Sequence, residues 1–417
     1  MSATATPDRV LISHPVHQHA YETAVAASQA GLLECFVTGL YWTGSGETDP
    51  RRWRMLPEAL ARHIERELSR RRHPALDPAR VRVIGRYHLP ATVIRRSAGR
   101  LPGVRDLDLD RWATRRFDRA VARLLGQVEG VALVHAFEGG ASWTLRAAKE
   151  AGLRTVLDVP SAHERLVRAE AEETGSLAVP SAEVAVEREL ADLLLAPSGY
   201  VAACLEEAGV PASRVRRLPY GVDPEVFRPA AAARPDGRFR ALFVGKVGDC
   251  KGVRYLLEAW RRLALPDAEL LLAGPLGRAG RRLLAEYQGG YRWLGALPAP
   301  ELRRWYQRSD VFVFPSLAEG SARVTYEAMS SGLPLVVTPN SGSVVRDGVD
   351  GFVVPARDVE AICERVRQLH ADPDARREMG MSGRALIERR YTWRHYHQRL
   401  ASTYRSVLAG QPIGALD

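Results

Sequence analysis

The sequence has no long hydrophobic run and few cysteines. No stretch of about 18 consecutive apolar residues occurs, and residues 1–9 lack the apolar core of a secretory signal. The four cysteines, Cys35, Cys204, Cys250 and Cys363, do not have the spacing of a metal site or of a disulfide framework. These absences argue against a membrane-spanning or classically secreted protein. They favour reduced thiols, so we expect a cytoplasmic protein.

Lysine is scarce as well. Of the 59 basic residues only three are lysines, and two of these, Lys246 and Lys251, lie in one glycine-containing loop between an expected strand and an expected helix. A lysine ammonium is a compact charge that suits phosphate, and helix N-termini attract anions. The loop therefore favours a diphosphate site. A solvated turn that carries two unrelated lysines is the alternative.

Positive charge is concentrated in one part of the chain. The formal net charge is +10, and residues 51–123 contain 20 arginines against 8 acidic residues. Arg62, Arg66, Arg70 and Arg71 have helical spacing with apolar residues between them. Such a helix can lie on an anionic membrane surface, at the inner face of the cell membrane, or receive an anionic acceptor, and a solvated helix face is the alternative. Neither a zinc-finger spacing nor an aromatic-interleaved strand accompanies the arginines, so no nucleic acid partner is expected.

Apolar strands alternate with helices in both halves of the sequence. The expected strands are residues 9–13, 131–135, 155–159, 190–197, 239–245, 269–273, 311–315, 334–338 and 351–354. The expected helices are residues 21–33, 142–151, 253–263 and a long final one at 393–408. This alternation indicates parallel sheets built from βαβ units. We therefore expect an α/β protein with two doubly wound, Rossmann-like domains.

A stretch rich in proline and glycine, residues 218–237, separates the two halves. A chain of 417 residues suits two domains of about 200 residues each. Doubly wound domains bind ligands beyond the carboxyl ends of their strands. The sequence thus predicts a first domain at residues 1–218, a second at 219–390, and a ligand in the cleft between them.

Two glutamates follow the expected strand that ends near Phe314. Glu319 lies in the loop after the strand and Glu327 in the next helix, with seven residues between them. The small residues Gly320 and Ser321 allow backbone amides to approach a ligand. The helix is expected to end at Gly332.

In their order and spacing these motifs resemble the retaining glycosyltransferases of family 4, which belong to glycosyltransferase group 1 and have the GT-B fold. The two glutamates match the nucleotide-sugar site of that family, and Gly245-Lys246 and Lys251-Gly252 match its phosphate-binding pair. Other matches are residues 191–198, 219–227, 272–274 and 293–295, so the likeness covers most of residues 190–400. The resemblance implies two domains that face each other across a cleft, the second binding the nucleotide sugar. A C-terminal helix, residues 391–417, packs back on the first domain.

The resemblance also implies roles for individual residues. Lys246 and Lys251 bind the diphosphate, Glu327 accepts hydrogen bonds from the ribose, and Glu319 contacts the sugar or the reacting centre. The other residues implied to bind the donor are Gly245, Gly274, Leu294, Gly320, Ser321, Ala322 and Arg323. Family members usually have Phe-Gly where Ser321 to Arg323 stand, and from this departure we expect Arg323 to reach the phosphates.

Histidines mark the first half of the chain. His135 ends an expected buried strand and matches the family's histidine near the donor sugar, so we assign it to catalysis with Glu319 and Lys251. A satisfied core histidine is the alternative. The residues expected to face the acceptor are His17, His19, Asp158 and His163.

The loop of residues 14–21 departs from the family pattern, because many members have a Gly-Gly pair here for the donor contact of the first domain. A metal site formed by His14, His17 and His19 is an alternative reading of this loop. No carboxylate or cysteine lies at ligand spacing nearby and the family needs no metal, so none is expected. Asp106 and Asp108 imitate the metal-binding Asp-x-Asp of the other major glycosyltransferase fold. Arginines surround them, and we interpret them as solvated charge.

The sequence therefore predicts an enzyme, a hexosyltransferase that moves a sugar with retention from a nucleotide diphosphate sugar. The acceptor is a glycan, a lipid-linked molecule or a small secondary metabolite, and no cofactor is expected beyond the donor. UDP is favoured over GDP, because residues 293–297 offer backbone groups and a small pocket but no acid for a guanine edge. The alternatives are a sugar-nucleotide epimerase, a phosphorylase and a non-catalytic subunit that binds a nucleotide sugar.

Overall fold

The chain forms two compact units in the computed structural model, which describes residues 8–16, 19–41, 71–85, 87, 109–162, 164–165, 182–231 and 236–411. The first unit comprises Met1–Asp158, Ser181–Leu195 and His397–Gly414. The second comprises Val159–Pro180, Ala196–Tyr396 and Ala415–Asp417. The expected domain boundaries at 218/219 and 390/391 stay predictions.

The first sheet has seven strands in the order β3-β2-β1-β4-β5-β6-β7. In chain order the strands are β1 Arg9–His14, β2 Leu33–Thr38, β3 Val81–Val83, β4 Val131–Phe137, β5 Arg154–Asp158, β6 Leu193–Ala196 and β7 Val215–Arg217. The pairings from β3 to β6 are all parallel. The order 3-2-1-4-5 is that of a Rossmann-like sheet.

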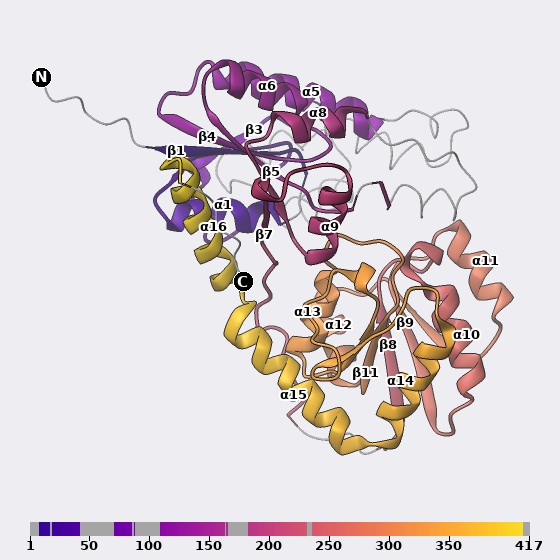
Figure 1. Ribbon diagram of the computed structural model, residues 1–417. Helices are drawn as coiled ribbons and strands as arrows, with labels where there is room; N and C mark the ends of the chain where they lie inside the picture. Colours follow the sequence, from indigo (N-terminus) through magenta and orange to yellow (C-terminus); the bar gives the residue numbers. More distant parts are fainter. Residues whose placement is uncertain are drawn as a thin grey trace, which may run out of the picture. The chain divides into compact units, whose positions relative to one another are not determined.

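Helices cover both faces of this sheet. The helices of this part of the chain are α1 Ala20–Gln29, α5 Leu109–Leu125, α6 Ser142–Glu150, α8 Ala182–Leu190, α9 Gly199–Glu207 and α16 Trp393–Leu408. Helices α5, α6 and α8 lie side by side on one face, and α1 and α16 lie on the other (Figure 1). From His397 onwards α16 belongs to the first unit.

The second sheet has the order β10-β9-β8-β11-β12-β13, and all its pairings are parallel. Its strands are β8 Phe239–Val244, β9 Ala268–Ala273, β10 Tyr291–Gly295, β11 Val311–Phe314, β12 Leu335–Val337 and β13 Gly351–Val353. Its helices are α10 Val253–Leu263, α11 Arg278–Glu286, α12 Ala299–Gln307, α13 Arg323–Ser330, α14 Val359–Ala371 and α15 Pro373–Arg390. This 3-2-1-4-5-6 order is that of a doubly wound Rossmann sheet, so the fold class is confirmed as two Rossmann-like α/β domains.

Aromatic side chains fill the core beneath the central strands of the second sheet. Phe243 on β8 stacks on Phe314 of β11 at 5.6 Å between ring centroids, and Phe312 stacks on Phe314 at 6.0 Å. All three are at most 2% exposed. Burial of such large apolar surfaces fixes the registers of β8 and β11, and so the loops that follow both strands.

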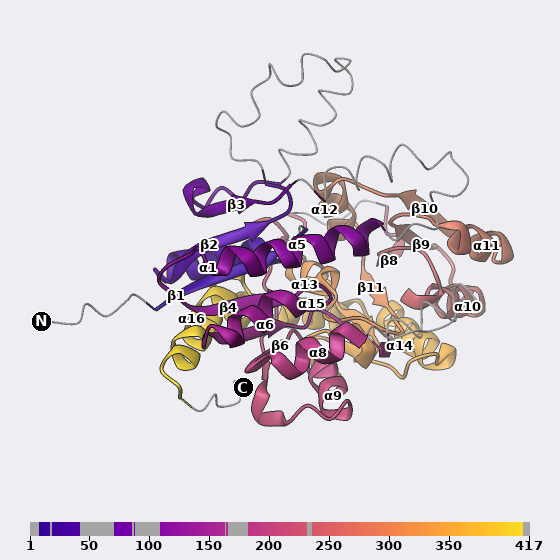
Figure 2. The same cartoon turned by 90° about the horizontal axis from the view of Figure 1, so that it is seen from above.

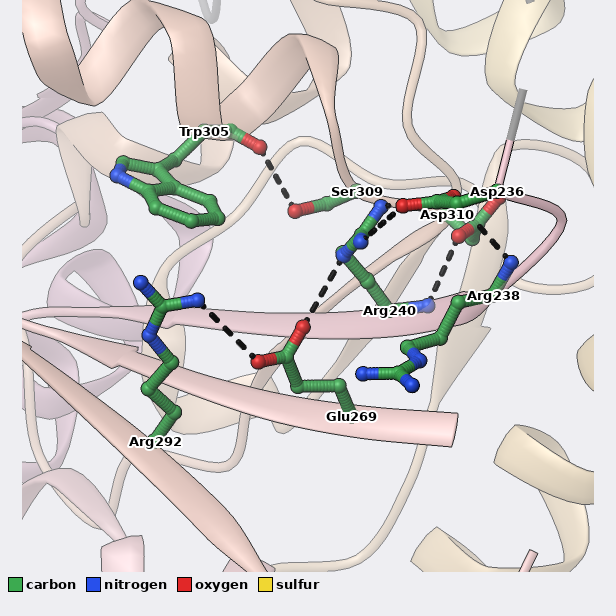
Figure 3. Close-up of polar contacts among 8 residues, drawn as sticks. All are labelled: Asp236, Arg238, Arg240, Glu269, Arg292, Trp305, Ser309 and Asp310. Atoms are coloured by element: carbon green, nitrogen blue, oxygen red, sulfur yellow. Dashed lines mark hydrogen bonds and ion pairs between the residues drawn. The ribbon is translucent and has the colours of Figure 1, made fainter. Parts of the chain in front are cut away.

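Polar contacts join the same strands at their amino ends (Figure 3). Glu269 on β9 accepts a hydrogen bond from Arg240 on β8 at 3.1 Å and lies 3.6 Å from Arg292 on β10. The backbone N–H of Arg240 donates to Asp310, just before β11, at 2.8 Å. One half-buried carboxylate thus ties three neighbouring strands at the end of the sheet where they begin.

The first helix of the chain is shorter than the sequence analysis predicts. The helix expected at residues 21–33 ends at Gln29, because Gly31 adopts a left-handed conformation with φ of 73° and Leu33 opens β2. By contrast, α10 and α16 have the expected bounds. In the described part of the chain no helix combines the length and the apolar character that a bilayer span requires.

Candidate functional site

The loop after β8 is held against two other loops of the second unit. Gly252 adopts a left-handed φ of 72°, and a Cβ placed on it would lie 1.9 Å from the carbonyl oxygen of Pro315. A Cβ on Gly274, after β9, would lie 1.9 Å from the carbonyl oxygen of Gly245. Only glycine fits at these two positions. The chain therefore brings the ends of β8, β9 and β11 into backbone contact, at the edge where doubly wound sheets bind ligands.

Lys251 and Glu319 meet at this edge. The ammonium of Lys251, at the end of a short 3₁₀ helix, donates to a carboxylate oxygen of Glu319, which follows β11. Their side chains are 21% and 20% exposed, so both stay accessible to a ligand. Lys246 is exposed in the same loop. The structure thus brings together the cation expected on the diphosphate and the carboxylate expected on the sugar.

The segment between Glu319 and α13 is tightly packed. A Cβ on Gly320 would lie 1.6 Å from the carbonyl oxygen of Pro160. The Ser321 hydroxyl lies 3.0 Å from the Tyr326 hydroxyl and donates to the carbonyl of Gly342 at 3.0 Å. Hydrogen bonds of its side chain thus hold this serine in place, where the family usually has phenylalanine.

Two residues expected to bind the donor, one of them on its phosphates, have other partners in this structure. The backbone N–H of Ala322 donates to the carbonyl of Ser341 at 3.0 Å. The guanidinium of Arg323 lies 5.6 Å from the ring centroid of Trp393, in a cation–π contact. Arg323 is exposed. Their phosphate roles stay predictions, and they require a change of partner on ligand binding.

Glu327 projects from α13 towards a buried tyrosine. The hydroxyl of Tyr306, on α12, donates to a carboxylate oxygen of Glu327 at 3.0 Å, and Tyr306 is fully buried. Burial raises the pKa of Glu327, while Arg323 and the hydrogen bond from Tyr306 act in the opposite direction. The hydrogen bond therefore fixes the orientation of the carboxylate. Because the group is buried, leaving it without hydrogen-bond donors would cost free energy, which suits a group that accepts hydrogen bonds from the hydroxyls of a ligand.

An exposed indole lies beside the expected base pocket. Trp293 on β10 donates from its ring N–H to the carbonyl of Gly274 at 3.0 Å, and its side chain is 45% exposed. Leu294 follows it and is partly buried. The carboxyl ends of β9 and β10 therefore present a ring face and backbone polar groups next to the loop of Lys246.

The first unit contains a buried histidine–aspartate cluster. His19 Nε2 and Asp158 Oδ2 lie 2.9 Å apart, and His135 Nε2 lies 3.8 Å from the same oxygen. His135 Nδ1 is hydrogen-bonded to the Tyr404 hydroxyl of α16 at 2.6 Å. Phe137 stacks on the His135 ring at 5.1 Å. The topology thus joins the ends of β4 and β5, the start of α1 and the C-terminal helix.

His135 is fully enclosed in this cluster. It is 0% exposed, and its Nε2 makes no hydrogen bond with any described residue. Burial lowers the pKa of His135 to about 4; Asp158 raises it and His19 lowers it. The imidazole is therefore neutral at physiological pH, and its expected contact with the donor sugar stays a prediction.

The structure does not describe all of the residues that the sequence analysis names. His17, His163, Arg62, Arg66, Arg70, Asp106 and Asp108 lie outside the described residues. His14 is buried and contacts the edge of Phe137 at 4.5 Å between centroids. No group of three histidine, cysteine or acidic side chains in the described ranges is placed to hold a metal ion.

The sequence did not reveal two tyrosines that orient expected site residues. Tyr306 reaches Glu327 from α12, and Tyr404 reaches His135 over 269 positions of sequence. Both tyrosines occupy buried positions of amphipathic helices, where an aromatic residue is normally explained by packing alone. The sequence offers only a weak signal for such contacts. A buried tyrosine hydroxyl needs a polar partner, but the sequence does not show which residue that partner is.

Comparison with known proteins extends these observations. Residues 238–372 match the family model of the glycosyl transferases group 1. The alpha-maltose-1-phosphate synthase of Mycolicibacterium smegmatis is 32% identical over 225 residues, which are 47% of this chain and 58% of that protein. The GDP-mannose-dependent alpha-(1-6)-phosphatidylinositol monomannoside mannosyltransferase of the same organism is 30% identical over 281 residues, 61% of this chain and 71% of that protein.

Solved structures share the whole architecture at low identity. Sucrose-phosphate synthase from Thermosynechococcus elongatus has a TM-score of 0.69 at 18% identity, covering 97% of this chain and 100% of that one. HepE of Anabaena, solved with UDP and glucose, has a TM-score of 0.62 at 15% identity, covering 96% and 100%. The chain spans only about half the length of several curated relatives. For two further bacterial proteins the match covers 57% and 45% of the relative's length.

The match to the mannosyltransferase covers more than two thirds of that protein. The family model covers most of the second sheet, including the Lys251–Glu319 pair and Glu327. The chain therefore belongs to the glycosyl transferases group 1 and has the GT-B fold.

Proposed function

We propose that this protein transfers a sugar from a nucleotide diphosphate sugar, with retention of anomeric configuration. The contact between Lys251 and Glu319 carries the proposal. In such a donor the sugar is bonded directly to the diphosphate, so a cation for one and a carboxylate for the other must be neighbours. The two loops place them side by side.

The basic loop would stabilise the leaving group. As the glycosidic bond breaks, negative charge grows on the diphosphate, and cations fixed in advance lower the barrier. Lys251 is partly exposed and Lys246 is exposed, so both can reach a phosphate. On donor binding the phosphate would share or replace the contact that Lys251 makes with Glu319, and so free Glu319 for the sugar hydroxyls.

Glu327 would bind the ribose. A carboxylate is a suitable acceptor for the two hydroxyls of a vicinal diol, as in dinucleotide-binding folds. The hydrogen bond from Tyr306 fixes one carboxylate oxygen and leaves the other available for a diol. A protonated carboxyl group accepts hydrogen bonds from a diol less well. Because burial raises the pKa of Glu327, binding should weaken at a higher pH than with an ordinary glutamate.

Retention fits a front-face reaction in which the leaving phosphate accepts the proton of the acceptor. In this scheme no enzyme group attacks the sugar. Glu319 is held by Lys251, an arrangement that suits a hydrogen-bond acceptor for sugar hydroxyls better than an attacking nucleophile.

We propose UDP as the nucleotide. The sole carboxylate between Gly274 and Pro298 is that of Glu286, which is ion-paired with Arg254 at 2.8 Å. Because of this ion pair, Glu286 is a poor acceptor for the edge of a guanine base. The Trp293 ring and the backbone groups beside Leu294 suit a smaller pyrimidine base. Relatives point both ways: HepE was solved with UDP, and the mycobacterial mannosyltransferase is named GDP-mannose-dependent.

The acceptor is proposed only as a class. It is a glycan, a lipid-linked molecule or a small metabolite, and the first unit is proposed to hold it. Of the residues expected to contact it, His19 and Asp158 form a buried pair. One relative is named as a phosphatidylinositol monomannoside mannosyltransferase, and this name supports a lipid-linked acceptor as one of the three classes.

A donor panel tests the proposal. The protein is incubated with UDP- and GDP-linked sugars, with and without mixed acceptors, and products are resolved by mass spectrometry and anomeric NMR. Transfer with release of the nucleoside diphosphate and retained configuration supports the proposal. An epimerised donor without any acceptor, or sugar release that requires inorganic phosphate, would assign the alternatives instead. Nucleotide binding without turnover would indicate a binding subunit.

A further inference from the structure

Two helices of the first unit carry an exposed surface that the proposed chemistry does not use. Helices α5 and α6 run side by side on the same face of the sheet in both views (Figures 1 and 2). We define the arginine–tryptophan surface by Trp112, Arg116, Arg119 and Arg123 on α5 and Trp143 and Arg146 on α6. All six side chains are exposed.

The helical period places the α5 members on one stripe. Trp112, Arg116, Arg119 and Arg123 follow each other at spacings of four, three and four residues, which returns to the same side of a helix. The opposite side of α5 is buried against the sheet through Phe117 and its neighbours. The stripe is therefore the outward face of the helix.

The arginines of this surface have no acidic partner in the part of the chain that the structure describes. Among the described residues, Arg116, Arg119, Arg123 and Arg146 form no ion pair with a carboxylate. Arg115 on the same helix contrasts with them, because it is ion-paired with Glu183 of α8 at 2.6 Å. The surface thus concentrates positive charge that is available to a partner.

Two indoles are exposed within this charge. Trp112 and Trp143 are 46% and 47% exposed. The guanidinium of Arg116 lies 5.8 Å from the Trp112 ring centroid, and that of Arg119 lies 4.9 Å from the Trp143 centroid. The amphipathic ring of tryptophan is enriched at membrane–water interfaces.

We propose that the arginine–tryptophan surface docks the protein on an anionic lipid bilayer. Charge complementarity commits the surface to an anionic partner, because its four guanidinium groups pair with no acid of the described ranges. The amphipathic indoles favour a bilayer over a soluble polyanion, since their rings enter the interface while the arginines meet lipid phosphates. The inference does not rest on the proposed donor or reaction.

Vesicle flotation with the full chain tests this inference. The native protein should float with phosphatidylcholine vesicles that contain phosphatidylglycerol. Much less should float with pure phosphatidylcholine, and binding should weaken at high salt. The double variant Arg116→Gln/Arg119→Gln should partition about thirtyfold more weakly, because each basic residue near an anionic surface contributes about fivefold.

A matched control lies on the same helix. Arg111→Gln/Arg115→Gln removes two arginines that contact Glu183 and should weaken partition far less. Brominated lipids should quench tryptophan fluorescence in the native protein, and Trp112→Phe/Trp143→Phe should remove most of that quenching. Each variant should bind nucleotide like the native protein, which separates loss of docking from loss of the proposed function.

Three results would overturn the proposal. The first is native protein that does not float with the anionic vesicles at low salt. The second is equal weakening by the two arginine pairs. The third is quenching that persists without Trp112 and Trp143. Binding to a soluble polyanion such as heparin in the absence of vesicle binding would assign the surface to a polysaccharide instead.

Discussion

Lys251 and Glu319, 68 positions apart in the sequence, are joined by a hydrogen-bonded ion pair at the carboxyl end of the second sheet. One follows β8 and the other follows β11, the two strands whose phenylalanines stack in the core. The rigid centre of the sheet thus fixes the distance between two loops that carry the expected chemistry. This arrangement leads to the first prediction.

Lys251→Ala should lower transfer activity at least a hundredfold, because the leaving diphosphate loses a fixed cation. The chain offers a matched control in its third lysine. Lys149 is ion-paired with Asp192 at 2.6 Å in the first unit, so Lys149→Ala should leave turnover nearly unchanged. Steady-state rates on both variants, with thermal melts as a check on folding, decide the matter. Similar rates for the two would remove Lys251 from the mechanism.

The pH dependence of nucleotide binding should report on Glu327. Since burial raises the pKa of this carboxyl, affinity should fall with decreasing pH sooner than for an ordinary glutamate. Tyr306→Phe removes a hydrogen bond that lowers the pKa, so the midpoint should move to higher pH. Glu327→Gln should bind weakly and lose this dependence.

Titrations across pH for the native protein and the two variants test this assignment. An unmoved midpoint in Tyr306→Phe would show that the tyrosine only packs, and unchanged affinity in Glu327→Gln would exclude the ribose role.

The stability of the folded chain should depend on His135 at mildly acidic pH. The folded protein keeps this imidazole neutral down to a pKa of about 4, whereas the unfolded chain takes up the proton near 6.5. Stability is therefore complete above 6.5 and declines as pH falls through this window, by up to about 3 kcal/mol. Denaturant melts of native protein and His135→Gln measure the difference, and identical slopes with pH would contradict the assignment.

Tyr404→Phe should destabilise the first unit by about 1–3 kcal/mol at neutral pH, because a buried imidazole nitrogen loses its partner. A double-mutant cycle with His135→Gln isolates the interaction. Strict additivity of the two changes would show that the C-terminal helix does not act through this hydrogen bond.

Gly252→Ala should distort the basic loop. The added methyl group would lie 1.9 Å from the carbonyl oxygen of Pro315, in addition to the strain of a left-handed φ. Gly289→Ala is the control, since Gly289 has a φ of 85° with nothing within 4 Å of the added carbon. Both variants should lose about 1–2 kcal/mol from backbone strain, and only Gly252→Ala should also lose nucleotide affinity. Equal affinities would mean that the loop does not need its contact with Pro315.

Much of the second unit could be predicted from the sequence, because its elements are strongly patterned. The helix of residues 253–263 has the expected bounds, and the apolar runs before Gly245 and Pro315 are β8 and β11. Glycines at strand ends and the spacing of the two glutamates identified the loops that carry the candidate site. These signals are local, so a single sequence contains them.

The contacts that orient the site could not be predicted in the same way. Tyr306 and Tyr404 act across many positions of sequence, and no spacing rule connects them with Glu327 or His135. The strand β2 was missed because Leu33–Thr38 directly continues an apolar helical pattern, and only the left-handed turn at Gly31 separates them. The Arg323–Trp393 contact likewise depends on the path of the chain into α16.

Calorimetric titration of the native protein with UDP and with GDP tests the central claim most directly. We expect saturable binding of UDP, weaker binding of GDP, and a loss of UDP affinity in Lys251→Ala and Glu327→Gln that Lys149→Ala does not share. Absence of binding to either nucleotide, or equal affinity in all three variants, would contradict a nucleotide-sugar site at the carboxyl end of the second sheet.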